Sequence, residues 1–211
     1  MTAKLETVTM CASFEQRLVI EDTAAVVEQL RLAVPHLLID RKVLPGMPAT
    51  LLASDGTGNR PVEATFGLEG VGRRLLLNAR SETVRERRTF SRLIEEGRAA
   101  VPMSGFYEPS SMRAAGRQAF FRPAGGTLLA LALLDPARGQ FVILTQDSAG
   151  AVAPHHPRMP VLAGPEQVSR WLQAGAIEDG APPLLVDLPV ATRPSGDRDP
   201  SPQEDYVQRL L

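Results

Sequence analysis

The chain has 211 residues, of which 44% are hydrophobic and 22% charged, and its formal net charge is −1. This composition predicts one globular domain with a sizeable core, and the charge excludes binding of nucleic acid through an overall basic surface. No apolar run reaches the roughly 20 residues of a membrane helix, and a single Cys excludes an internal disulfide, so we expect a cytoplasmic protein.

The first half of the chain predicts two helices and several short strands. Residues 1–9 are polar and unpatterned, and residues 1–10 are expected to form an N-terminal extension. Hydrophobic residues at helical spacing predict a helix over Thr23–Leu32, and a short helix around Phe90 with Thr89 as its N-cap and Gly97 just past its end. Strands are expected at Leu51-Leu52, Val62–Phe66 and Leu75–Leu77.

The second half opens with Val101–Glu108, which predicts an apolar strand, a Ser-Gly turn and a second strand that ends on a carboxylate. Further strands are expected at Gln118–Arg122, Leu128–Leu134, Phe141–Thr145 and Leu184–Leu188, and a helix from Pro165 to near Gly175. Residues 193–211 are rich in Pro, Ser and Asp and are expected to be a mobile tail. The pattern predicts a single α+β domain, residues 11–192, with a mainly antiparallel, barrel-like sheet and a few short helices.

Glu108 is the first candidate for chemistry. Because it follows Phe106 and Tyr107, we expect it at the mouth of an apolar pocket, where a carboxylate is suited to acid–base work. The alternative is a strand-end Glu in water. Gly105, in the turn before it, allows the backbone to approach another segment closely.

Three further stretches accompany Val101–Glu108: Met10-Cys11, Asn78-Ala79-Arg80-Ser81-Glu82, and His156-Pro157-Arg158-Met159-Pro160. In this order they resemble the motifs of the SOS-response-associated peptidase (SRAP) family, and the resemblance covers about residues 10 to 175. It implies a protein that forms a covalent cross-link with abasic sites in single-stranded DNA.

The resemblance also implies a role for each motif residue. If Met10 is removed, Cys11 becomes a 1,2-aminothiol, which traps an aldehyde first as an imine and then as a thiazolidine ring. Glu108 and His156 would transfer protons, and Asn78 would hold the substrate or the amine by hydrogen bonds. Arg80 and Arg158 would contact phosphates that flank the abasic site.

Several other residues are weaker DNA candidates. Phe66 could stack on a base, and Pro45 could act in a wedge that separates strands. Arg85 belongs to a run with Arg87, Arg88 and Arg92, which is either a solvated face or a contact to the DNA backbone. No cofactor is expected, and one Cys with three His argues against a zinc site, since zinc needs three or four ligands. We expect a monomer that associates with the nucleoid after DNA damage.

The sequence departs from the family pattern at four places. Cys11 lies behind ten residues instead of directly after the initiator Met, Ala12-Ser13 replaces Gly-Arg, and Pro109 and Phe66 replace two tryptophans. Two other functions therefore stay open: a thiol hydrolase in which Cys11 attacks a peptide with His156 as base and Glu108 as orienter, and a non-covalent DNA-binding module.

Overall fold

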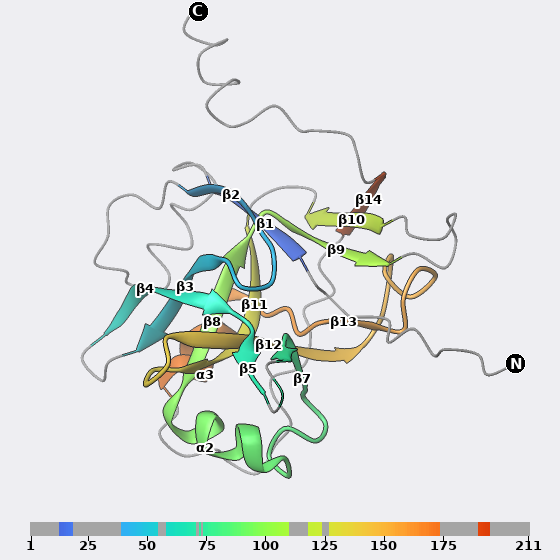
Figure 1. The fold of residues 1–211 in the computed structure, drawn as a ribbon. Coiled ribbons are helices and arrows are strands. Elements are labelled where there is room, and N and C mark those ends of the chain that lie inside the picture. The colour runs from blue at the N-terminus through green and yellow to red at the C-terminus, as the bar shows by residue number, and fades with distance from the viewer. Residues whose placement is uncertain are drawn as a thin grey trace, which may run out of the picture.

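The structure, a computed structural model, describes residues 13–18, 39–54, 58–70, 72, 74–109, 118–123, 127–173 and 190–194. These residues form two β-sheets, a short hairpin and two helices (Figure 1). The larger sheet holds β3 (Pro48–Ser54), β4 (Asn59–Phe66), β7 (Asn78–Arg80), β8 (Arg98–Met103), β11 (Leu128–Asp135), β12 (Gln140–Asp147) and β13 (Arg158–Pro160). The smaller sheet holds β1 (Ser13–Leu18), β2 (Ile39–Val43), β9 (Gly105–Pro109), β10 (Gln118–Pro123) and β14 (Val190–Pro194). The remaining elements are the hairpin of β5 (Leu68–Glu69) and β6 (Leu75–Leu76) and the helices α2 (Arg88–Glu96) and α3 (Pro165–Gln173).

The larger sheet closes on itself. Its strand order is β11-β8-β3-β4-β12-β13, and an additional pairing of β11 with β12 completes a ring of five strands. Pairings are antiparallel except that β12 runs parallel to β4 and β7. The smaller sheet, in the order β14-β10-β9-β1-β2, is antiparallel throughout. The predicted α+β class with a mainly antiparallel, barrel-like sheet is therefore confirmed.

Two hydrophobic clusters form the core. One fills the inside of the ring and continues onto the inner face of the smaller sheet, and the other lies between the outside of the ring and the two helices. Because alternate side chains of a strand point to opposite faces, β11 supplies Ala130 to the first cluster and Leu131 to the second. All eight residues of β11 are buried, which explains the uninterrupted apolar run in the sequence.

Most predicted elements are present where the structure can be described. The strands around Leu51, Val62 and Phe141 fall within β3, β4 and β12, and the helix at Pro165 is α3. The predicted N-cap was wrong, because α2 begins at Arg88 and its N-cap is Arg87. The strand expected at Leu75–Leu77 ends at Leu76, and β14 extends to Pro194, into the segment predicted as a tail. The helix expected at Thr23–Leu32 and the strand expected at Leu184–Leu188 lie outside the described residues.

Gln16 anchors β1 of the smaller sheet to the ring. Following the register of β3 and β8 beyond Leu52 and Ala100 brings Thr50 opposite Pro102, which has no N–H to donate. The fully buried Gln16 amide fills this gap. Its Nε2 donates to Thr50 O (2.7 Å) and Pro102 O (2.9 Å), and its Oε1 accepts from Thr50 N (3.0 Å). A polar side chain thus replaces a missing part of the strand ladder.

Gly105 lets β9 follow β8 through a sharp bend. A Cβ at this position would lie 2.3 Å from Phe120 Cζ and 2.6 Å from Phe121 O. Glycine is therefore needed for the close approach of β9 to β10, as the sequence predicted. The bend carries the chain from the ring to the smaller sheet and delivers Glu108.

Candidate active site

Glu108 lies in the interior, and this excludes the alternative of a carboxylate in open water. It is fully buried, on the face of β9 that also carries Phe106. Its Oε2 lies 3.5 Å from Nδ1 of His156, which is 6% exposed. The structure therefore brings together the two residues to which the family resemblance gives proton transfer.

The backbone of Arg158 holds the His156 ring. Nδ1 lies 3.0 Å from Arg158 O and 3.2 Å from Arg158 N. Two oxygens, from Glu108 and from the Arg158 carbonyl, thus face the same ring nitrogen. The Arg158 N–H also points at Nδ1 as a donor, so the three contacts determine where the ring lies, and either tautomer leaves Nε2 to exchange a proton with a substrate.

Strand β12 pairs with β7 and β13, the two strands that carry the other two motifs. On one side β7 runs parallel to it, with Asn78 beside Ile143 and Arg80 beside Thr145. On the other side β13 runs antiparallel, with Pro160 beside Thr145. Segments that are far apart in the sequence therefore meet at the end of β12, and Figure 1 shows β7 and β13 at this end. Asn78 is partly buried here and Arg80 is exposed.

Arg158 is buried and bound within the protein. Its Nη1 donates to Glu82 Oε1 (2.8 Å) and to Asp147 Oδ1, and its Nη2 donates to Glu82 Oε2 (2.9 Å) and Thr145 O (2.8 Å). The pKa of the Glu82 carboxyl lies below its ordinary value, chiefly because Arg158 donates hydrogen bonds to it. Burial disfavours the charge on Arg158, but the hydrogen bonds to Glu82 and Asp147 outweigh burial and raise its pKa.

The predicted DNA contacts fall into two groups. Arg80, Arg85 and Pro45 are exposed. Phe66 is fully buried, with its ring centroid 5.4 Å from that of Phe14 and 5.3 Å from that of Phe141. Base stacking was the expectation for Phe66, and its place in the core is inconsistent with it, because a base would have to open the ring of strands to reach it.

The run of arginines after Arg80 is exposed but not uniform. Arg92 pairs with Glu96 at 2.8 Å and with Asp135 at 3.5 Å, which fits the interpretation as a solvated face for this residue. Arg87 and Arg88 are exposed at the start of α2.

His155, the neighbour of His156, packs edge-on against Phe121, with 5.4 Å between the ring centroids.

Cys11 lies outside the described residues, but the strand that follows it is placed. Ser13 begins β1 and pairs with Tyr107, the residue before Glu108.

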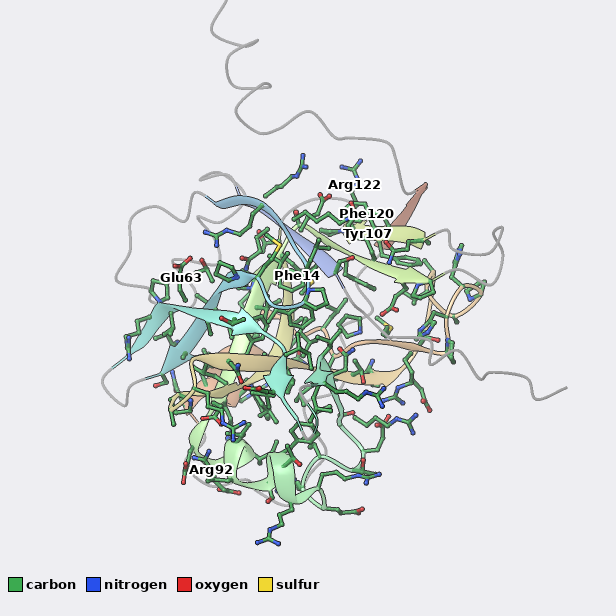
Figure 2. All side chains as sticks on the ribbon, in the orientation of Figure 1. Phe14, Glu63, Arg92, Tyr107, Phe120 and Arg122 are labelled. Carbon is green, nitrogen blue, oxygen red and sulfur yellow. The ribbon has the colours of Figure 1, made fainter. Side chains whose placement is uncertain are left out.

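Side chains on the outer face of the smaller sheet pack around Tyr107 of β9. This face is opposite the one that carries Glu108. The Tyr107 hydroxyl donates to Glu15, and Lys42 Nζ lies 4.0 Å from the centroid of the Tyr107 ring. Phe120 packs on the same ring at 4.6 Å between centroids. Figure 2 shows Tyr107, Phe120 and Arg122 gathered on this face.

Sequence reasoning missed Gln16 and assigned no role to Glu82. Nothing local in the sequence marks Gln16, since its partners Thr50 and Pro102 are far along the chain. Glu82 did carry a signal, because it belongs to one of the quoted motifs.

Within the described ranges, no group of three or more His, Cys, Asp or Glu side chains is arranged to hold a metal ion. No helix placed by the structure has the length and apolar character of a membrane span.

A family model described as SOS response associated peptidase (SRAP) matches residues 10–191. Solved structures share the fold. A protein from Bordetella bronchiseptica is 18% identical with a TM-score of 0.69, over 87% of this chain and 99% of that one. A phage-related protein from the same organism is 23% identical with a TM-score of 0.65, over 90% and 97% of the two chains. A protein from Bacteroides thetaiotaomicron is 17% identical with a TM-score of 0.62, over 80% and 83%. No curated protein matches the sequence.

Proposed function

This chain belongs to the SOS response associated peptidase (SRAP) family, and on that premise we propose that it cross-links abasic sites in single-stranded DNA through Cys11. The observation that supports the proposal best is the buried pair of Glu108 and His156, 3.5 Å apart. Glu108 directly follows Tyr107, which pairs with Ser13 at the start of β1, and Ser13 is two residues after Cys11 in the sequence.

The chemistry needs both groups of an N-terminal Cys11. The α-amine adds to the aldehyde carbon of the opened sugar, and loss of water gives an imine. The thiolate of Cys11 then adds to the imine carbon, and the nitrogen takes up a proton. The product is a thiazolidine, so one aldehyde and one aminothiol yield the cross-link and one water.

The buried pair would supply the proton transfers. Glu108 takes a proton from the amine as it attacks, and His156 gives a proton to the sugar oxygen as the ring opens. Asn78 would hold the substrate or the amine by hydrogen bonds. Exposed Arg80 and Arg85 would contact flanking phosphates, and exposed Pro45 would lie at the point where strands separate.

The first ten residues must be absent for this chemistry, since an amide nitrogen at Cys11 cannot form an imine. Two routes give the active form. Translation begins at Met10 and an aminopeptidase removes it, or the chain cuts itself between Met10 and Cys11. We favour the first, because Met10 directly precedes Cys11 and residues 1–9 show no pattern.

Peptide hydrolysis is the second candidate function, and the same pair supports it. The Nδ1 of His156 faces the Glu108 carboxyl, as a base faces its orienting group in a thiol hydrolase. Hydrolysis requires only the thiol of Cys11, whereas the cross-link requires its α-amine as well. A chain that retains residues 2–10 and still cleaves peptides would favour hydrolysis.

The test is a denaturing gel of the processed protein with a single-stranded oligonucleotide that carries one abasic site. We expect a shifted band that disappears when borohydride has first reduced the aldehyde. Glu108→Gln and His156→Ala should slow the reaction by about 100–10,000-fold, the usual contribution of a general acid or base. His155→Ala is the matched control and should change the rate far less. Equal cross-linking to the reduced oligonucleotide would exclude the aldehyde mechanism, and reversible binding alone would indicate a non-covalent module.

A further inference from the structure

We propose that Glu82 and Arg158 form a positioning pair for His156, and that Arg158 holds this imidazole in place instead of contacting a DNA phosphate. The inference rests on the proposed role of His156 in proton transfer. It changes the role expected for Arg158 and gives one to Glu82.

The backbone of Arg158 determines where the imidazole lies. His156 Nδ1 contacts both the N–H and the carbonyl of Arg158, at 3.2 and 3.0 Å. The same nitrogen is 3.5 Å from Glu108. A shift of the Arg158 backbone therefore moves the ring relative to the carboxylate with which it would exchange protons.

The side chain of Arg158 fixes that backbone from the other end. It is 8% exposed, and Glu82 accepts from both terminal nitrogens in the bidentate arrangement that a planar guanidinium favours. Asp147 and the Thr145 carbonyl accept from the same two nitrogens. A phosphate could reach Arg158 only by displacing these partners, whereas Arg80 is exposed on the neighbouring strand.

Glu82 connects Arg158 to a second segment of the chain. It lies in the turn after β7, two residues beyond Arg80. The bond from Glu82 to Arg158 thus ties the segment that carries Asn78 and Arg80 to the segment that carries His156. The Glu82 carboxylate of one motif and the Arg158 guanidinium of the other therefore connect the two motifs directly.

The first experiment separates positioning from phosphate binding. Cross-linking rate at saturating DNA and affinity for an abasic-free oligonucleotide are measured for Glu82→Gln and Arg158→Lys, with Glu86→Gln as the control from the same turn. Glu82→Gln and Arg158→Lys should lower the rate by up to about 100-fold, the effect of a small misplacement, and leave affinity within about twofold. Glu86→Gln should change neither quantity.

The opposite pattern would overturn the proposal. If Arg158 contacts a phosphate, Arg158→Gln weakens affinity and lowers the salt slope by about 0.7, while the rate at saturation stays unchanged. Arg85→Gln serves as the reference for such a loss. Because Glu82 is exposed, Glu82→Gln should fold even if Arg158→Gln does not.

The second experiment needs no DNA and therefore separates this inference from the proposed function. Nitrogen-detected NMR of the imidazole, assigned with His156→Ala, should show one dominant tautomer in the wild type. Glu82→Gln should produce a mixture of tautomers, and Glu86→Gln should not. Identical His156 spectra in the wild type and Glu82→Gln would refute the positioning pair. A wild type that fails to cross-link would refute only the proposed function.

Discussion

Replacing Gln16 by Leu tests whether this side chain stabilises the ring of strands at Pro102, where a backbone hydrogen bond is missing. Leu is similar in size but can neither donate nor accept a hydrogen bond. The substitution removes the bonds from Nε2 to Thr50 O and Pro102 O and the bond from Thr50 N to Oε1. Because Gln16 is fully buried, water cannot replace it without opening the interface between the sheets.

The expected magnitude follows from these three bonds. A buried hydrogen bond contributes about 1 kcal/mol net, and an unpaired buried N–H adds a desolvation penalty, so the free energy of unfolding should fall by about 3 kcal/mol. For a chain of this length the melting temperature should fall by about 6–12 °C. Urea unfolding measures the loss directly, and an unchanged m-value would show that the unfolded state is not affected.

Pro102→Ala provides the matching control. Alanine restores an N–H that can donate to Thr50 O, so it should recover about 1 kcal/mol in the Gln16→Leu background but not in the wild type. Two results would refute the idea that Gln16 replaces the missing backbone hydrogen bond. One is a loss of unfolding free energy below about 1 kcal/mol for Gln16→Leu, and the other is strict additivity of the two substitutions.

Three further predictions concern other parts of the molecule. The pKa of Glu82 is depressed, so its pairing with Arg158 stabilises the fold above the ordinary pKa of about 4.3 and is lost as pH falls through the lower value. The unfolding free energy of the wild type should therefore be higher than that of Glu82→Gln at about pH 7, and the difference should shrink as the pH falls below about 4.3; a difference that stays constant would contradict this. Gly105→Ala should destabilise by about 1–3 kcal/mol in urea unfolding, since its Cβ meets the Phe121 carbonyl at 2.6 Å, and a neutral effect would show that β9 can move away. Intact-mass measurement of the native protein should give a chain that begins at Cys11, and retention of residues 2–10 with an irreversible cross-link would exclude the thiazolidine.

The sequence predicted best those features that depend on neighbouring residues. The apolar run of β11 indicated a buried strand, and the Ser-Gly turn before Phe106 indicated the bend between β8 and β9. The position of Glu108 directly after two aromatic residues predicted the mouth of an apolar pocket, whereas the structure buries this carboxylate completely, beside His156.

Features that depend on distant segments were not predictable in this way. Phe66 could be a surface aromatic or a core residue, and only the closure of the ring against Phe14 and Phe141 decides between them. The same holds for Arg158, because whether an arginine is free for a phosphate depends on the carboxylates that the fold brings to it. Sequence motifs indicated which residues matter, but the partners of each were set by strand pairing across the whole chain.

The pairing of β1 with β9 also has a consequence for the order of events during protein synthesis. β1 can pair early with β2, but β9, its partner on the other side, comes about 90 residues later, and His156 follows still further on. At about 5–20 residues per second, the ribosome needs about 7–30 s to extend the chain from Cys11 to His156. A co-translational aminopeptidase would thus free Cys11 before its site exists, whereas self-cleavage could begin only after His156 has been added. Pulse-labelled nascent chains should therefore already carry the mature N-terminus under the first route and carry residues 2–10 under the second.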